Sequence, residues 1–453
     1  MNLPPATIFF EFQLPNATTW FYFSFLLAVA LFFKFSRFLS VRNWDVLSLF
    51  LLVPGLLLLQ EANAMNQPSS GGNGGKIAPQ PANAALPRAD QLRGIGYIWL
   101  VAGSGYFFLR CLLDLALVRR PALTANLTPG GLAWLGGALF IGLVYVAILP
   151  PDEIVGKKSV ITGEMASQVE TAAGDVAGRE VRFWVESSLA IASHLAIIAG
   201  LIVIGRRHFQ DSETGIAAAT LYLLIPYTAM FVGQFHHVLP TALLVWAVVF
   251  YRRPSLAGLL LGLAAGSQYF PALVFGVWCS FYWRRGAGRF AAAFALAFVF
   301  SLAIGAILLF IQGDLAKNLK SVLALSDWQA WKAPIPESFW TGVHWAYRLP
   351  VFIGYLAFLV ITAFWPAPKN LAHVLALSAA ALIGIQFWYA DQGGVYVLWY
   401  LPLLLMLVFR PNLSDRLPNP MVDENDWLGK ITRLVRRMVS RMGKQPEPAV
   451  KVP

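Results

Sequence analysis

Charged residues are scarce in this chain. Only 13% of its 453 residues are Asp, Glu, Lys or Arg, whereas a water-soluble domain carries about 25%. Hydrophobic residues make up 58% of the chain, and the mean hydropathy is +0.62. This composition excludes soluble enzyme folds, disordered proteins and secreted disulfide scaffolds.

Cysteine and the common chemical motifs are also lacking. Cys111 and Cys279 both lie inside apolar segments, so we expect no disulfide framework. The absence of a Walker A sequence, a helix-opening GxGxxG and an HExxH argues against nucleotide chemistry and a zinc site. His236 and His237 are adjacent and would point about 100° apart on a helix, which does not suit a shared metal. We therefore expect no metal and no cofactor.

Apolar segments follow one another along the chain. Most are close to the length of about 17–25 residues that crosses a bilayer as a helix. We therefore predict an all-α polytopic membrane protein with about 11–13 transmembrane passes. The start of the chain has no basic region and no small-residue cleavage site, so we expect no removable signal peptide. The apolar segments lie at 19–36, 44–60, 95–118, 131–149, 187–205, 214–232, 238–251, 255–283, 288–312, 349–365, 371–389 and 393–409.

Basic residues fall in short connections between these segments. The net charge is +11, and its position at segment ends indicates membrane orientation, not a nucleic-acid surface. The positive-inside rule places these connections in the cytoplasm. We expect an outside N-terminus and a cytoplasmic C-terminus in a plasma membrane of the bacterial inner-membrane type. The basic connections contain Lys34, Arg37 and Arg42, Arg119 and Arg120, Arg206 and Arg207, Arg252 and Arg253, Arg284 and Arg285, Lys369, and Arg410.

The segment 255–283 interrupts the alternation of sides. Arginine pairs at 252–253 and 284–285 flank it, so both of its ends belong to the cytoplasmic side. Its centre, GSQYFP at 266–271, contains the glycine and proline that make a helix break easiest. We predict a broken helical hairpin with its tip near the outer face. The alternative is one long tilted helix that is kinked at the proline.

Composition divides the chain into four parts: a two-helix membrane segment at 1–60, a flexible outer linker at 61–93, a polytopic core at 94–409 and a cytoplasmic tail at 410–453. In the tail, apolar residues recur at helical spacing between 427 and 442. Basic residues line the other face, which predicts an interfacial helix bound to anionic lipids. A nucleic-acid patch is the weaker alternative beside a bilayer, so we expect no nucleic-acid partner.

Polar and aromatic residues gather in the connections predicted to lie outside. Carboxylates accept hydroxyl protons, Arg and His bind phosphate, and aromatic rings stack on sugars, so this face suits a hydroxyl-rich ligand beside lipid. An aromatic belt is the alternative, and it explains the aromatics but not the charges. The candidates are Asp152 and Glu153 after segment 131–149, Gln234, His236 and His237 in GQFHH, Gln268 and Tyr269 at the tip, Glu337, His344 and Arg348 in PESFWTGVHWAYR, and Asp391 in YADQGG.

One stretch carries a family resemblance. From Pro226 to Arg285, GQ precedes an apolar helix, a basic YRRP turn, an AGLLLGLA helix and the break SQYFP. This order resembles the GT-C superfamily of integral-membrane glycosyltransferases, in particular the polyprenyl-phosphate-mannose-dependent mannosyltransferases. The break has Gln268 where that branch often has lysine. The resemblance covers about 131–409 and includes Ser338, Gly342 and Arg348, which resemble an outer-loop Ser-x-x-Gly-x-x-x-Arg pattern in looser spacing.

The resemblance implies a fold and a reaction. A GT-C-like core would transfer a hexose, with mannose as the first candidate, from a polyprenyl-phosphate donor to a lipid or glycan acceptor outside the cytoplasm, without a metal. An acid soon after the first core helix would deprotonate the acceptor hydroxyl; Asp152, next to Glu153, matches that position, with Asp391 and Glu337 as rivals. The donor would be held by Arg348 together with His236 or His237, and by Gln268 and Tyr269 at the tip.

Two other classes of function are consistent with the same residues. A transporter or flippase for a lipid-linked or small polar solute would also use broken helices at a polar cavity. A non-catalytic membrane scaffold is the third alternative. The position of the cavity distinguishes them, since an outward pocket open to lipid favours a transferase and a central cavity favours a transporter.

Overall fold

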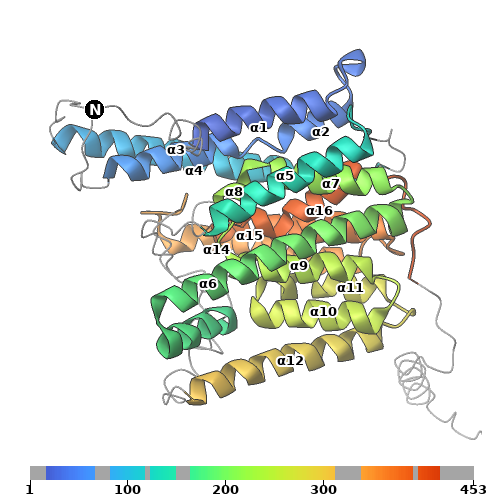
Figure 1. Ribbon diagram of the computed structural model, residues 1–453. Helices are drawn as coiled ribbons and strands as arrows, with labels where there is room; N and C mark the ends of the chain where they lie inside the picture. The colour runs from blue at the N-terminus through green and yellow to red at the C-terminus, as the bar shows by residue number, and fades with distance from the viewer. Residues whose placement is uncertain are drawn as a thin grey trace, which may run out of the picture.

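The regular elements of the computed structural model are helices throughout the residues that it describes, 17–66, 82–117, 123–148, 164–311, 338–390 and 396–418. They are α1 (Ala17–Phe32), η1 (Phe35–Arg37), α2 (Val41–Ser48), α3 (Val53–Asn66), α4 (Ala82–Asp114), α5 (Pro129–Ile148), α6 (Glu164–Ile204), η2 (Gly205–Phe209), α7 (Ser212–Leu224), α8 (Pro226–Met230), α9 (Phe235–Val249), α10 (Pro254–Ser267), η3 (Phe270–Val274), α11 (Phe275–Phe281), α12 (Ala287–Ile311), η4 (Trp345–Tyr347), α14 (Arg348–Phe364), α15 (Leu371–Trp388) and α16 (Val397–Phe409) (Figure 1).

Long apolar helices confirm the prediction of an all-α polytopic membrane protein. Seven spans within the described residues are long and apolar enough to cross a membrane. Shorter apolar helices, including α9, α10 and α16, lie among them, and the total number of passes stays a prediction. The seven spans are Val41–Asn63, Arg88–Asp114, Pro129–Ile148, Phe183–Phe209, Ala287–Gly305, Trp345–Phe364 and Leu371–Trp388.

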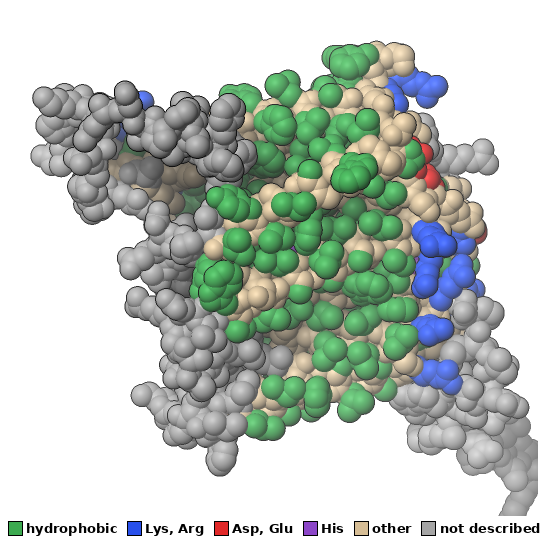
Figure 2. Space-filling model, viewed as in Figure 1, with side chains coloured by type: hydrophobic (Ala, Val, Ile, Leu, Met, Phe, Trp, Pro, Cys, Tyr) green, Lys and Arg blue, Asp and Glu red, His purple; other side chains and the backbone are tan. Residues whose placement is uncertain are grey.

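The centre of the molecule is formed by α15 and α16. Every residue of α16 is buried, and nearly all of α15 is buried as well. The helices α5 and α14 instead expose most of their apolar side chains. Figure 2 shows hydrophobic side chains covering the visible face of the helices, as expected for a surface that contacts lipid.

The molecule has two chemically different ends. Lys and Arg side chains lie along one edge of the visible face (Figure 2). We call this the basic end; it contains the turns after α9 and α11, the loop before α15 and the residues after α16. Because α9, α14 and α16 run toward this end, they begin at the other one, where α10 and α15 finish. We call that other end the aromatic end. These basic turns share one end of the molecule, in agreement with the sequence pattern. The cytoplasmic location of the basic end stays a prediction.

The hairpin predicted at 255–283 is present. Helix α10 ends at Ser267, Gln268 adopts an extended conformation, and the chain continues as η3 and α11. The Tyr282 hydroxyl, just after α11, donates a hydrogen bond of 2.6 Å to the carbonyl of Tyr251, just before α10. Both ends of the segment therefore lie together at the basic end. The alternative of one kinked helix is wrong, because a continuous helix would separate these ends by its full length.

Three glycines let α10 pack tightly against α12. Gly258, Gly262 and Gly266 share one helix face, and a methyl group added at each would collide with α12. The collisions at Gly258 and Gly262 are with the carbonyl oxygens of Phe290 and Phe294. Small residues spaced four apart allow membrane helices to approach backbone to backbone. The AGLLLGLA pattern is therefore a packing surface in this fold.

A buried ion network ties the N-terminal helices to the core. Within α4, Arg110 donates to Asp114 over 3.1 Å, a pair at i, i+4 spacing on one helix face. Arg110 also donates to Asp45 of α2 over 2.7 Å, and Arg410 after α16 reaches Asp114 over 2.7 Å. The sequence did not predict these two partners, because they come from distant segments. The two-helix segment at 1–60 is thus packed onto the core within its described part.

Several boundaries differ from those predicted. Helix α3 extends to Asn66 and α4 begins at Ala82, so helix covers both margins of the predicted linker 61–93. Helix α6 begins at Glu164, well before the predicted apolar segment 187–205, because hydropathy does not mark a helix that continues beyond its apolar part. Residues 67–81 and the predicted interfacial helix at 427–442 lie outside the described residues.

Candidate functional site

The candidates fall into two groups. Asp152, Glu153, Glu337 and Asp391 lie outside the described residues, so the choice among the predicted bases stays a prediction. The remaining candidates are described, and most of them lie at the aromatic end. They are Gln234, His236 and His237 at the start of α9, Gln268 and Tyr269 at the hairpin tip, His344 beside η4, and Arg348 at the start of α14.

His237 is the best-defined polar group at this end. It is fully buried, and its Nδ1 accepts a hydrogen bond of 2.8 Å from the indole N–H of Trp399. An indole N–H can only donate, so the proton of the neutral imidazole lies on Nε2. Nε2 has no hydrogen-bond partner among the described residues. The fold thus holds His237 as a donor in one fixed tautomer.

The aromatic rings around His237 stack on one another. Phe270 of the hairpin covers one face of Trp399 at 3.8 Å between centroids, and Tyr396 lies against it at 3.9 Å. All three rings are fully buried. Trp399 therefore has no face left to stack on a sugar, because the rings of Phe270 and Tyr396 already occupy both of them. Trp399 instead joins the hairpin tip to α9 and α16.

Two buried amides lie at the ends of the helices that finish here. Gln268 follows α10, and its side-chain Oε1 has no hydrogen-bond partner among the described residues. The same holds for Nε2 of Gln386, two residues before the end of α15. Burying an amide group without a hydrogen bond is unfavourable, so such groups are candidates for ligand contacts. Sequence reasoning missed Gln386, although a lone amide in the apolar run IGIQFW was a usable signal.

Arg348 is buried at the first position of α14. It lies within electrostatic range of the Tyr389 phenol, which follows α15. The indole N–H of Trp340 donates a 2.9 Å hydrogen bond to the carbonyl of Phe387, so the segment before α14 is bound to the end of α15. Helix α15 also packs against η3, which places Arg348, Tyr389 and the hairpin tip at the same end of the molecule.

The other described candidates are less enclosed. Gln234, His236 and Tyr269 are half-buried, and the rings of His236 and His237 lie 5.0 Å apart. His344 is exposed, and its Nδ1 accepts from the amide of Ala346 to cap η4. This local capping role accounts for His344 without a ligand. Within the described residues, no group of three or more His, Cys, Asp or Glu is placed to hold a metal.

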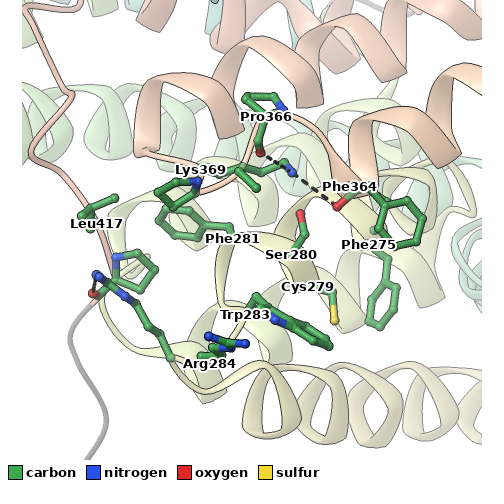
Figure 3. A pocket seen from close by; sticks show the side chains of 16 residues that line it. Phe275, Cys279, Ser280, Phe281, Trp283, Arg284, Phe364, Pro366, Lys369 and Leu417 are labelled. Carbon is green, nitrogen blue, oxygen red and sulfur yellow. Dashed lines mark hydrogen bonds between the residues drawn. The ribbon is translucent and has the colours of Figure 1, made fainter.

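A large cavity lies at the opposite end of the molecule. Its volume is about 850 Å³, and its lining includes Arg284, Arg285 and Lys369 (Figure 3). Lys369 is 3% exposed, and burial lowers its pKa to about 8. The cavity is thus remote from His237 and Gln268, and it contains none of the candidates predicted from the sequence.

Comparisons with protein-family models, with curated proteins and with solved structures give no match for this chain. The GT-C resemblance therefore rests on the residues quoted above.

Proposed function

We propose that this chain is a membrane glycosyltransferase that moves a hexose from a polyprenyl-phosphate donor to an acceptor outside the cytoplasm. The observation that supports it best is the His237 site. The neutral imidazole of His237 lies where α9 meets the broken hairpin, and Trp399 holds it in place. Its Nε2 proton has no hydrogen-bond acceptor among the described residues. A fixed neutral donor beside lipid suits a phosphate or a sugar hydroxyl, because it adds no charge to a poorly hydrated site.

The other described groups have complementary chemistry. The Gln268 Oε1 accepts hydrogen bonds, and the Gln386 Nε2 donates them, so the two amides can engage hydroxyls of a sugar. Arg348 would supply the cation for the donor phosphate, a role for which a guanidinium is well suited. These three side chains come from α14, α15 and the end of α10, so a ligand that contacts all of them would bridge three helices.

The reaction also needs a base for the acceptor hydroxyl. In our proposal Asp152 accepts that proton, with Glu153 beside it, and Asp391 and Glu337 are the rivals. Tyr389, which is buried near Arg348, precedes Asp391 by two residues. Asp391 is therefore the stronger of the two alternative candidates for the base. A positioned carboxylate contributes about 10²–10⁴-fold to rate in general-base catalysis.

A transporter is less well supported. Its polar groups would be expected near the middle of the membrane. The mid-helix polar groups His194 and Tyr355 are instead satisfied, since His194 contacts the Tyr222 hydroxyl at 2.8 Å and Tyr355 donates to the Ala381 carbonyl. Both ring nitrogens of His194 have partners, since Nε2 also lies 3.3 Å from the Val232 carbonyl, so His194 is a packing histidine. The buried polar atoms that we discuss at Gln268, Gln386 and His237 lie toward helix ends.

The proposal is tested with purified protein in detergent, a short-chain polyprenyl-phosphate mannose or glucose, and membrane lipid extracts as acceptors. Donor binding and sugar transfer are measured separately. We expect Asp152→Asn to lower transfer about 10²–10⁴-fold with donor binding intact. Arg348→Ala and His237→Phe should weaken donor binding first, because both side chains are proposed to contact the donor.

Asp90→Asn is the matched control, because Asp90 is exposed and pairs only with Arg93 among the described residues. It should leave both measurements unchanged. If Asp391→Asn abolishes transfer and Asp152→Asn does not, the base is Asp391. If folded wild-type protein binds neither donor, the transferase proposal is wrong, and uptake of polar solutes into proteoliposomes becomes the next test.

A further inference from the structure

The cavity at the basic end is lined by two kinds of side chain, aromatic and cationic. It lies between α11, the turn before α12, the loop joining α14 to α15, and residues 417–418 after α16. The aromatic rings of Phe275, Phe281, Trp283 and Phe364 form its apolar wall, and three cationic side chains also line it (Figure 3). A volume of about 850 Å³ is in the range of ligand pockets.

Lys369 is a buried cation without a carboxylate partner among the described residues. Its ammonium donates to the carbonyl oxygens of Pro366 and Ala363, at 3.0 and 3.3 Å. An ammonium has three donors, so one is left for a ligand. Buried charges are normally paired, and an anion in the cavity would supply the missing charge.

Two arginines add to this positive charge. Arg285 donates to the Pro418 carbonyl at 2.8 Å through one nitrogen, which leaves its other donors for further contacts. Arg284 is exposed at the cavity edge and has a φ of 59°, a left-handed conformation that residues other than glycine rarely adopt. No carboxylate is among the residues that line the cavity.

Exposed aromatic side chains mark the level of the cavity relative to lipid. Trp283 and Phe364, both in the lining, are 59% and 77% exposed, and the neighbouring Trp365 is also exposed. Aromatic residues next to basic turns are typical of the level where lipid headgroups meet the hydrocarbon. The cavity therefore lies beside headgroups and acyl chains.

We propose that this cavity binds one anionic phospholipid, with its phosphate at Lys369, Arg284 and Arg285 and an acyl chain along the aromatic wall. This inference is independent of the proposed transferase site, which lies at the other end of the helices. Free inorganic phosphate would use the same cations. The apolar wall favours the lipid, because free phosphate would leave that wall without a partner.

A native thiol reports occupancy. Cys279 lines the cavity and is half-buried, whereas the other cysteine, Cys111, is fully buried. The experiment measures N-ethylmaleimide modification of Cys279 by intact mass, using delipidated protein in detergent with dioleoyl phosphatidylglycerol or dioleoyl phosphatidylcholine. We expect phosphatidylglycerol to slow the modification at least fivefold and phosphatidylcholine to have little effect.

Variants locate the effect. Arg284→Gln should raise the phosphatidylglycerol content needed for half-protection about fivefold, the worth of one cation near an anionic headgroup. Lys369→Met should raise it further, and thermal unfolding checks that this variant is folded. Arg206→Gln removes an exposed cation of the same end that does not line the cavity, so it should leave protection unchanged.

Three outcomes would overturn the proposal. If the two lipids protect Cys279 equally, or if neither lipid protects it, the cations do not select an anionic lipid. If Arg206→Gln and Arg284→Gln weaken the protection of Cys279 equally, the effect comes from the overall charge of this end and not from the cavity. Protection by inorganic phosphate alone at matched concentration would make free phosphate the ligand.

Discussion

At the scale of single residues, Asp114 has the most demanding environment in the buried ion network. Its side chain is 0% exposed and lies between Arg110 and Arg410, which are themselves mostly buried. Removing one partner of a buried ion pair leaves an uncompensated charge and typically costs about 3–5 kcal/mol. We expect Asp114→Asn to lower the free energy of unfolding by that amount, measured by denaturant titration in mixed micelles.

The matched comparison is Asp90→Asn. Asp90 is 72% exposed and pairs with Arg93 at 3.3 Å. Exposed pairs contribute about 0–1 kcal/mol, so this variant should unfold nearly as the wild type does. Equal effects of the two substitutions would mean that the network around Asp114 is as hydrated as the surface.

Lys369 gives the cavity a pH dependence. Its pKa falls to about 8 because burial disfavours the charged form. Between about pH 8 and its ordinary value of 10.5, the folded protein binds fewer protons at this site than the unfolded chain, so the Lys369 contribution to stability rises with pH. Anion affinity changes in the opposite direction, because the ammonium is lost as pH rises through 8.

We therefore expect phosphatidylglycerol to protect Cys279 less at pH 9 than at pH 7. Because the thiol also titrates, the measured quantity is the ratio of modification rates with phosphatidylglycerol and with phosphatidylcholine at each pH. Arg284 and Arg285 also line the cavity and keep part of the affinity. In Lys369→Met the ratio should be independent of pH; an unchanged ratio in the wild type would exclude Lys369 as a contact.

At the scale of elements, the contact between α10 and α12 depends on absent side chains. A branched side chain at Gly262 would collide with the Phe294 carbonyl, which cannot move without shifting α12. We expect Gly262→Val to lower the free energy of unfolding by about 1–3 kcal/mol or more, as overpacking does. Thermal unfolding in detergent measures this loss.

Gly354→Ala on α14 is the control for that substitution. A methyl group at Gly354 has nothing within 4 Å, and the position is exposed. Alanine favours the helix by about 1 kcal/mol over glycine, so this variant should be equally or more stable. If Gly262→Val were as stable as Gly354→Ala, the two helices would not be in backbone contact.

The sequence predicted some relations between elements and not others. The hairpin was predictable because arginines at both ends of 255–283 leave only one arrangement that keeps them together, and glycine and proline mark the break. The His237–Trp399 hydrogen bond was not, since it joins residues 162 positions apart, and periodicity within one helix has no bearing on such a pair. The sequence predicted that GQFHH, the hairpin tip and the start of the last helix lie at the same end of the molecule. It did not predict which of their atoms are in contact.

At the scale of the whole molecule, the distribution of charge predicts orientation. Gly233 is exposed near the aromatic end, and a side chain there meets nothing within 4 Å. Arg207 and Arg284 are exposed at the basic end. In a protein without Cys111 and Cys279, we expect Gly233→Cys to react with an impermeant maleimide from outside the cell. Arg207→Cys and Arg284→Cys should react only after the membrane is opened.

The labelling separates two predictions, the return of the hairpin to its starting side and the orientation of the whole molecule. If Arg284→Cys reacts from the same side as Gly233→Cys, the hairpin does not return to its starting side. If all three are reversed, the hairpin stands and the predicted orientation is wrong. Activity in the donor assay would show that the labelled variants are correctly assembled.

The hairpin also has a consequence for biosynthesis. Residues 254–283 contain no Asp, Glu, Lys or Arg, and arginines stand on both sides of them. The α10 arm of 14 residues is about 21 Å long, less than the roughly 30 Å of hydrocarbon that a helix inserted by itself must cross. Both arms must therefore enter the bilayer together once Arg285 has left the ribosome. With the basic end in the cytoplasm, as the positive-inside rule predicts, no charged side chain is then translocated, and the insertion machinery never has to release the first arm alone.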